Sequence, residues 1–401
     1  MAAIRPFRAL RPARDAAAAV SSVPYDVVST EEARQLAADN PLSFLHVTRS
    51  EIDLAPGTDP YSSAVYAKAR TNLESLRASA PLVSEDQPSL YFYRLRMGGH
   101  EQTGIAASFS VDQYEHDVIK KHERTRRDKE DDRTRHIIEL GAQTGVVFLT
   151  YRCSDDIDRL CRAVTADAPL YDFRADDGVH HTIWKVRDHE STALVDAFSR
   201  VPALYIADGH HRAASAARAR AEKRTPESDW FIAVAFPSDQ VHILPYNRTV
   251  KDLAGQTPEA FLAALGARVP VREGAATPRG KGEVGMFLAG TWYAVDLSAA
   301  APADGTRASS LDVARLQQHV LEPLLKIGDV RTDKRIDFVG GARGTAALEA
   351  AVTGGKAAVA FSMHPVTIDD LMAISDEGGI MPPKSTWFEP KLRDGLLVHT
   401  I

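Results

Sequence analysis

One segment near the middle of the chain joins an apolar strand to an alanine-rich helix through a short polar turn. It runs Leu204-Tyr205-Ile206-Ala207-Asp208-Gly209-His210-His211-Arg212-Ala213-Ala214. A glycine at this place lets the backbone turn tightly and approach a ligand closely. The helix start offers unpaired N–H groups and the positive end of the helix dipole, which favour an anion. The turn therefore predicts a phosphate site without a P-loop, with His211 and Arg212 in the first helical turn. The alternative is a strand-to-helix turn with surface charges.

The composition limits the classes of protein to which the chain can belong. Its 401 residues are 44% hydrophobic and 25% charged, which is ordinary for a globular protein of roughly two or three domains. The net charge of -6 argues against nucleic-acid binding, which needs an excess of lysine and arginine. Two cysteines cannot form a disulfide framework, and no apolar run is long enough for a membrane span. We therefore expect a cytoplasmic protein with a small-molecule substrate and with neither nucleic acid nor a membrane as partner. The oligomeric state stays open, a homodimer included.

Predicted strands and helices alternate irregularly, which indicates an α+β or mixed α/β architecture. The predicted strands include 27–28, 44–47, 90–95, 104–109, 204–208 and 230–236, and the predicted helices include 61–79, 155–164, 309–318 and 366–374. The composition shifts near Thr249, where a stretch rich in alanine, glycine and proline begins. We therefore divide the chain into a nucleotide-binding core with an N-terminal extension, 1–248, and a second α/β region, 249–401. The last loop of the second region would have to return to the first half to reach the site.

A second polar segment lies before this turn and mixes imidazoles, carboxylates, cations and a hydroxyl. Phosphoryl transfer uses such groups, because cations bind phosphate oxygens while carboxylates hold Mg²⁺ and accept a proton. The members are His122, Glu123, Arg124, Thr125, Lys129, Asp132, Arg133 and His136. The segment therefore predicts part of a phosphoryl-transfer site. An exposed helix with ion pairs four residues apart, or a charged loop, is the alternative.

A stiff polar loop lies near the end of the chain. It runs Met381-Pro382-Pro383-Lys384-Ser385-Thr386-Trp387-Phe388, and its two prolines restrict the backbone. Its lysine and hydroxyls are suited to a phosphate or a small polar substrate, and its two aromatic rings to anchoring the loop or stacking on a base. Rigid loops with such side chains often carry function. An ordinary well-packed turn is the alternative.

Five short motifs, spread from the N-terminus to this last loop, occur together. They are Arg5-Pro6-Phe7-Arg8-Ala9-Leu10-Arg11-Pro12, Val23-Pro24-Tyr25-Asp26-Val27-Val28, His122-Glu123-Arg124-Thr125 with Lys129, Asp132 and Arg133, Asp208-Gly209-His210-His211-Arg212, and Met381-Pro382-Pro383-Lys384-Ser385-Thr386-Trp387-Phe388. In this order they resemble the DUF1015 family of bacterial and archaeal proteins, over nearly the whole chain. The Asp-Gly-x-His-Arg turn is also similar to the phosphate motif of the ParB and sulfiredoxin superfamily. Sulfiredoxin chemistry needs a cysteine where this chain has His210, so that activity is excluded.

The resemblance implies a ParB/sulfiredoxin-like nucleotide-binding core and a free-serine kinase activity, in which ATP and L-serine give O-phosphoserine. Glu123 is then the predicted base, with Asp132 as the second choice. The predicted nucleotide-binding residues are His122, Arg124, Lys129, Asp208, Gly209, His210, His211 and Arg212. The predicted substrate-binding residues are Arg133, as a clamp for the amino-acid carboxylate, and Thr125, Lys384, Ser385 and Thr386. Asp208 and Asp26 are the predicted ligands of Mg²⁺.

Two other functions fit the same residues. A nucleotide sensor that binds ATP or CTP would need the Asp208–Arg212 turn but neither Glu123 nor Asp132. A metal-dependent hydrolase would use the histidines and carboxylates and would work without nucleotide. The sequence also leaves open the donor nucleotide and the acceptor, since homoserine, threonine or another alcohol would fit as well as serine.

Overall fold

The computed structural model describes residues 1–79, 82–300 and 302–401 and divides the chain into two compact units. Unit 1 consists of Met1–Val241 and Pro390–Ile401, and unit 2 consists of His242–Glu389. The composition shift near Thr249 predicts a later boundary, at 248–249. Residues 246–248 lie in a strand that pairs with two strands of unit 2, so the boundary falls before them. The last twelve or so residues return to unit 1 because they pair with its N-terminal strands.

Unit 1 is built around a mixed nine-stranded sheet. Its strands follow the order β6-β11-β8-β12-β5-β4-β10-β9, and β1 pairs with β5 beside this path. β8 runs parallel to β12, and β6 to β11, whereas the other pairs are antiparallel. The predicted α+β class with mixed sheets is confirmed. The strands are β1 Ile4–Arg5, β4 Tyr91–Met97, β5 His100–Ser110, β6 Ile119–Lys120, β8 Val147–Tyr151, β9 Tyr171–Arg174, β10 His180–Lys185, β11 Leu204–Asp208 and β12 Trp230–Pro237.

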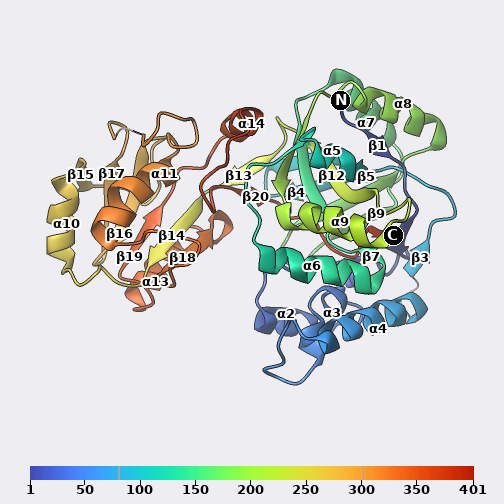
Figure 1. Cartoon of the computed structure of the whole chain (residues 1–401), viewed down its shortest axis with the longest axis horizontal. Helices are drawn as coiled ribbons and strands as arrows, with labels where there is room; N and C mark the ends of the chain where they lie inside the picture. Colours follow the sequence, from blue (N-terminus) through green and yellow to red (C-terminus); the bar gives the residue numbers. More distant parts are fainter. Residues whose placement is uncertain (80–81, 301) are drawn as a thin grey trace. The chain divides into compact units, whose positions relative to one another are not determined.

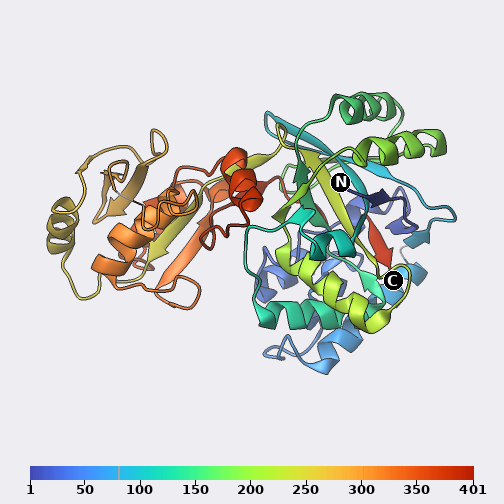
Figure 2. The same cartoon turned by 45° about the horizontal axis from the view of Figure 1, so that its top comes forward.

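A second sheet in unit 1 joins the two ends of the chain. Its order is β3-β2-β21-β7, with β2 Ala9–Pro12, β3 Leu82–Ser84, β7 Ala142–Gln143 and β21 Val398–Thr400. The helices of unit 1 are α1 Ala17–Val20, α2 Thr30–Ala37, α3 Leu45–Thr48, η1 Ser50–Asp53, α4 Ser63–Ser79, α5 Val111–Glu115, α6 Arg127–Leu140, α7 Asp155–Thr165, α8 Asp188–Phe198 and α9 His210–Lys223. α6 and α9 lie side by side, and α4 packs against α6 (Figures 1 and 2).

The core of unit 1 packs apolar residues of the large sheet against helices. Phe92, Ile105 and Phe231 on the strands join Leu194 of α8 and Ala213 of α9 in one buried cluster. Small buried alanines line the side of α9 that packs on the core, and Gly209 alone separates the N-terminus of this helix from the end of β11. Within the described ranges, the helices are all too short or too polar to cross a lipid bilayer.

Two predicted strands near the N-terminus are wrong. Residues 44–47 lie in a helical segment, because Phe44 precedes α3 and the chain continues into η1. A short apolar run fits one buried helical turn as well as a strand, so its sequence does not separate the two. Residues 27–28 lie in a turn, in which the N–H of Val27 donates to the carbonyl of Pro24 at 3.2 Å.

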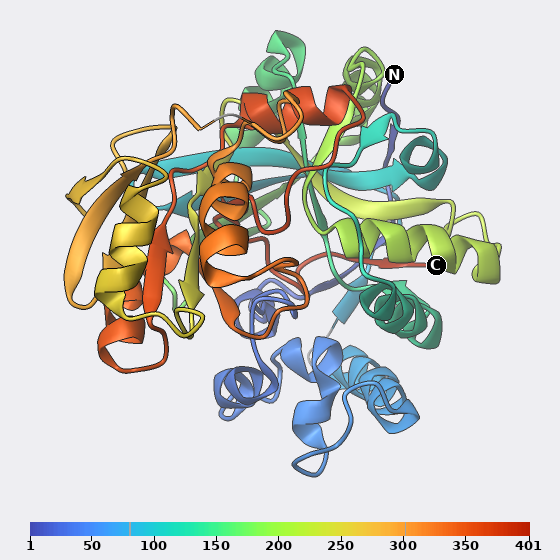
Figure 3. The same cartoon turned by 60° about the vertical axis from the view of Figure 1, so that its left-hand side comes forward.

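Unit 2 contains a six-stranded sheet in the order β15-β17-β16-β19-β14-β18 and a two-stranded sheet, β13-β20 (Figure 3). α13 packs on β14, β16 and β19. The strands are β13 His242–Leu244, β14 Tyr246–Val250, β15 Val271–Glu273, β16 Glu283–Leu288, β17 Thr291–Asp296, β18 Ile336–Gly340, β19 Val359–Ser362 and β20 Trp387–Glu389. The helices are α10 Pro258–Gly266, α11 Asp312–Leu316, η2 Gln317–Leu321, α12 Glu322–Leu325, η3 Gly341–Arg343, α13 Ala346–Thr353 and α14 Ile368–Asp376.

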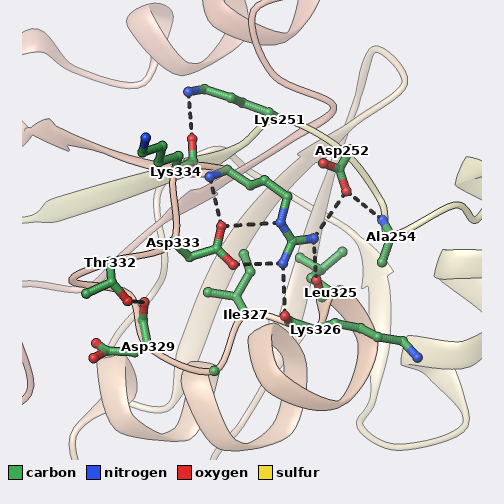
Figure 4. A network of polar contacts seen from close by, with 12 residues as sticks. Lys251, Asp252, Ala254, Leu325, Lys326, Ile327, Asp329, Thr332, Asp333 and Lys334 are labelled. Carbon is green, nitrogen blue, oxygen red and sulfur yellow. Dashed lines mark hydrogen bonds and ion pairs between the residues drawn. The ribbon is translucent and has the colours of Figure 1, made fainter.

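An arginine network ties the loop before β18 to its surroundings in unit 2 (Figure 4). Arg335 donates to both oxygens of Asp333, at 3.2 and 2.8 Å, and to Asp252 at 3.3 Å. It also donates to the carbonyls of Leu325 and Lys326, at 3.0 and 2.9 Å. A guanidinium has five N–H donors in a fixed plane, so one side chain can hold three segments together.

We predict that Gly395→Ala destabilises unit 1 by about 2 to 4 kcal/mol. Gly395 has φ +87°, and an added Cβ would lie 2.7 Å from Cβ of Phe44 in the buried core. The substitution therefore combines backbone strain with overpacking where the C-terminal segment meets α3. Urea unfolding followed by circular dichroism measures the change. Gly99→Ala is the control, because nothing lies within 4 Å of its added Cβ; equal effects of both substitutions would contradict the prediction.

Candidate functional site

The predicted strand, turn and helix are present at 204–223. β11 ends at Asp208, and Gly209 has φ 93° and ψ 31°, a left-handed conformation that favours glycine. Gly209 is also the N-cap residue of α9 and makes no side-chain cap hydrogen bond. The first N–H groups of a helix have no partner within the helix, so this end is electrostatically suited to an anion.

Arg212 lies in the first turn of α9 but is buried, with 6% of its surface exposed. Its Nη2 donates to both carboxylate oxygens of Asp26, at 2.7 and 2.8 Å, and its Nη1 donates to the carbonyl of Val146 at 2.8 Å. Gly145 and Gly209 leave room for it, since a Cβ on either would lie 3.1 to 3.3 Å from Cδ of Arg212. The terminal nitrogens of Arg212 are thus engaged by the protein. Its predicted role as a phosphate ligand stays a prediction.

Asp208 is paired with a lysine from the C-terminal segment. Nζ of Lys391 lies 3.4 Å from Oδ2 of Asp208, and Nη2 of Arg212 lies 3.9 Å from the same oxygen. Burial alone would raise the pKa of Asp208, but the ammonium and the guanidinium hold it well below its usual range. Sequence reasoning did not include Lys391 in the site. The only signal was its place directly after the stiff polar loop, and pairing across more than 180 residues is not readable from one sequence.

The C-terminal segment also places a carboxyl group, that of Asp394, near Arg212. Asp394 is 2% exposed, and its backbone pairs with that of Ser22 in both directions. Oδ2 of Asp394 is buried without a hydrogen-bond partner. Burial raises the pKa of Asp394 to about 7, although Arg212 opposes this rise; Asp26 adds to it. The segments around 22–26, 208–212 and 391–394 therefore meet in one buried charged cluster.

The histidines and Glu123 form a second group at the start of α9. The rings of His122 and His210 lie edge to face, 4.4 Å apart. The N–H of His122 donates to Nε2 of His210 at 3.4 Å, so the proton of His210 is on Nδ1, which lies 3.9 Å from Oε2 of Glu123. Burial lowers the pKa of His122 to about 4 and that of His210 well below its usual range, so both rings are neutral near pH 7. The Glu123 side chain is 40% exposed.

His211 points to the segment before α6, because its Nε2 accepts the N–H of Arg126 at 2.9 Å. Lys129, at the start of α6, donates to the hydroxyl of Tyr61 at 2.6 Å. Thr125 donates to the carboxylate of Glu130. Arg124 is exposed. The structure therefore brings His211 and the residues around 122–129 to the same end of α6 and α9.

Asp132 and Arg133 lie deeper in unit 1. The two oxygens of Asp132 accept from the hydroxyl of Tyr66 at 2.7 Å and from Nε of Arg133 at 2.8 Å. The guanidinium of Arg133 lies 4.2 Å from the ring centre of Tyr25. Arg133 and Arg212 both line a cavity of about 20 Å³, room for about one water. The other lining residues are Tyr25, His136, Ile137, Gln143, Thr144, Gly145, Val147, Phe231 and Ile232.

The predicted substrate-binding loop belongs to unit 2. Lys384 has φ 58° in a turn directly after the two prolines, and its carbonyl accepts from Nη2 of Arg248 at 3.1 Å. The hydroxyl of Ser385 donates to the carbonyl of Pro382 at 2.5 Å. Thr386 is half-buried beside them. The roles of these three residues at the site stay predictions.

The two predicted Mg²⁺ ligands both face cations. Asp26 is paired with Arg212 and Asp208 with Lys391. In the described ranges, no group of three or more histidines, cysteines or carboxylates is arranged to hold a metal ion. A dedicated protein-held metal site therefore does not fit these two carboxylates as they are placed.

The site thus lies in an α+β unit, at a glycine turn that leads into the N-terminus of a helix. The chain belongs to the DUF1015 family, described as proteins of unknown function, which it matches over residues 4–314. The predicted family is confirmed. Lys384–Thr386 and Lys391 lie beyond the matched range. No curated protein matches the chain in sequence.

Several solved structures are similar to the chain at low sequence identity. C-terminally truncated SbnI from Staphylococcus aureus is 13% identical, with 74% of this chain and 87% of that chain covered, at a TM-score of 0.41. A free serine kinase in complex with AMP is 13% identical, with 73% and 91% covered, at 0.38. A conserved hypothetical protein from Pyrococcus furiosus is 13% identical, with 74% and 95% covered, at 0.38. Because these scores lie below 0.5, the site's own residues must support any function.

We predict that Asp394→Asn changes how the stability of the protein depends on pH. A carboxyl group with a raised pKa in the folded state stabilises that state below its ordinary value of 3.8, and this contribution is lost as the pH rises through about 7. An asparagine at this position has no ionisable group, so the variant does not lose this stability as the pH rises. Its free energy of unfolding should therefore exceed that of the wild type by about 2 to 4 kcal/mol at pH 8, and by much less at pH 5.

Urea unfolding at both pH values measures the difference. Asp15→Asn, at an exposed position, is the control for removing one carboxylate. A variant that is less stable than the wild type by the same amount at pH 5 and pH 8 would contradict the raised pKa.

Proposed function

We propose that the protein is an ATP-dependent phosphotransferase that acts on the hydroxyl of a free amino acid, with L-serine as acceptor and O-phosphoserine as product. The class of reaction is inferred from the residues at the start of α9, and serine from the resemblance to the family. In this reaction the serine oxygen bonds to the γ-phosphorus of ATP, the bond from that phosphorus to the bridging oxygen breaks, and ADP leaves. The hydroxyl proton passes to a carboxylate base.

The observation that carries the proposal is the uncapped start of α9 beside Glu123. The N-terminal N–H groups of α9 favour phosphate oxygens, and His211 and Lys129 lie at the same end of α6 and α9. Glu123 approaches the same turn, 3.9 Å from His210, with its side chain 40% exposed. A phosphate site and an accessible carboxylate side by side are what transfer to an alcohol requires.

The surroundings of the two candidate bases favour Glu123. Both oxygens of Asp132 already accept hydrogen bonds from Tyr66 and Arg133, and the residue is 8% exposed. Its pKa is lowered because Arg133 and Tyr66 more than offset burial, which leaves it a poor proton acceptor. In this proposal Asp132 positions Arg133, and Glu123 takes the proton.

Arg212 takes a positioning role in the proposal rather than that of a direct phosphate ligand. Its guanidinium joins Asp26 and Val146 to α9, and this fixes the backbone that presents the N–H groups. Because Asp26 and Asp208 are each paired with a cation, the proposal assigns Mg²⁺ to the phosphates of ATP rather than to a site held by these carboxylates. When bound, Mg²⁺ would neutralise phosphate charge.

We predict that Glu123→Gln lowers the turnover of serine phosphorylation by about 10² to 10⁴-fold while ATP binding stays within a few-fold of the wild type. The reason is that the amide keeps the shape of the side chain and removes the proton acceptor. Mass-spectrometric detection of O-phosphoserine, with ADP measured in parallel and a panel of amino acids as acceptors, gives the rates. Asp131→Asn, at an exposed acidic position on α6, is the matched control.

The outcomes separate the proposal from its rivals. Retention of most activity in Glu123→Gln would remove Glu123 as the base. Tight ATP binding by the wild type with no product from any acceptor would instead indicate a nucleotide sensor. Hydrolysis that proceeds without nucleotide and stops with a chelator would indicate the metal-dependent hydrolase.

A further inference from the structure

Unit 2 contains a buried arginine, Arg248, whose hydrogen-bond acceptors are main-chain carbonyls. Arg248 lies on β14, between β18 and β19, and is 2% exposed. Its Nη1 donates to the carbonyl of Tyr246 and its Nη2 to the carbonyl of Lys384, and its guanidinium lies 5.6 Å from the ring centre of Phe338. Across the described residues, 1–79, 82–300 and 302–401, no carboxylate forms an ion pair with Arg248.

Another arginine of the same unit, Arg335, has its positive charge compensated by carboxylates of the chain. Arg335 also donates to two main-chain carbonyls, but Asp333 and Asp252 supply negative charge as well (Figure 4). Arg335 is more exposed than Arg248 and therefore needs this compensation less. Arg248 thus differs from Arg335 in the way its charge is compensated.

A buried charge without a counter-charge is unfavourable, since carbonyl dipoles only partly replace water. Burial lowers the pKa of Arg248 to about 10, which still leaves the guanidinium charged at neutral pH. The position therefore retains a positive charge that unit 2 does not neutralise. An anion from outside the unit would neutralise it.

The turn held by Arg248 combines a left-handed residue with a second cation. The carbonyl of Lys384 points to Arg248, and in a planar trans peptide the N–H of Ser385 then points the opposite way. Lys384 itself is left-handed, with φ 58°, and the N–H groups of such a residue and of the residues after it can form a concavity that suits anions. The ammonium of Lys384 lies 5.3 Å from the ring centre of Tyr246 and brings a second cation to the turn.

We propose that the Lys384 turn of unit 2 binds an oxyanion, the phosphate or carboxylate group of a small molecule, and that Arg248 is the buried positive charge on which this binding depends. Arg248 is a positioning residue in this scheme: it orients the peptide after Lys384 and adds its field to that of the ammonium. The inference holds for any reaction that the protein performs, because it uses only residues of unit 2.

Calorimetric titration of the full chain with inorganic phosphate and with acetate, at low salt, tests the proposal. Arg248→Met should weaken the binding of the favoured anion about tenfold or more, whereas Arg248→Lys should stay within a few-fold of the wild type, because it keeps the charge. Arg335→Met is the matched control, since it removes a compensated arginine from the same unit. Preference for phosphate over acetate would indicate a phosphorylated ligand, and the reverse a carboxylate.

Other results would overturn the proposal. If the wild type binds neither anion, or if Arg248→Met binds as the wild type does, the site is absent. If His211→Ala abolishes binding and Arg248→Met does not, the anion belongs to the start of α9 in unit 1. Equal losses in Arg248→Lys and Arg248→Met would mean that Arg248 only holds the carbonyl of Lys384. If Arg248→Met does not fold, Lys384→Gln decides, with weaker binding expected and unchanged binding against the proposal.

Discussion

The guanidinium of Arg212 is almost wholly removed from water, and a charge in such a place must be compensated inside the protein. The compensation comes from Asp26, with Val146 and the nearby Asp208 adding to it. These residues are far apart in the sequence, so the charged cluster forms only when the N-terminal segment and the strands β8 and β11 are in place. This one side chain joins them to the start of α9.

Because Arg212 is hydrogen-bonded to Asp26 and Val146, other groups at this turn are better placed to contact a ligand. Asp26 is paired with Arg212 and Asp208 with Lys391, as in many buried networks in which each charged group has a partner. The N-cap residue of α9 is Gly209, which has no side chain that could accept from the N–H groups of the first turn. The backbone, with Glu123 and His211 beside it, is therefore the part of this turn best placed to meet a phosphate and an acceptor.

The positive charges of two arginines in unit 2, Arg335 and Arg248, are compensated in different ways. Arg335 is surrounded by carboxylates and carbonyls and serves as a tie between segments. Arg248 is more deeply buried, donates to the carbonyls of Tyr246 and Lys384, and holds the turn that carries Lys384. A structural arginine has no need of an external anion, whereas one without a carboxylate gains from binding it. The same residue type in one unit thus points to two different roles.

The sequence by itself determined the family, the α+β class and the strand, glycine turn and helix at 204–223, because these depend on local pattern: apolar periodicity, a glycine and short motifs in order. It did not separate a strand from a helical turn at 44–47, where the three buried apolar residues Phe44, Leu45 and Val47 suit both. Only the tertiary structure decided that Arg212 pairs with Asp26, that Lys391 reaches Asp208, and that Arg248 has no carboxylate partner among the residues that the structure describes. Burial and ion pairing are properties of distant segments brought together, and no local pattern in one chain encodes them.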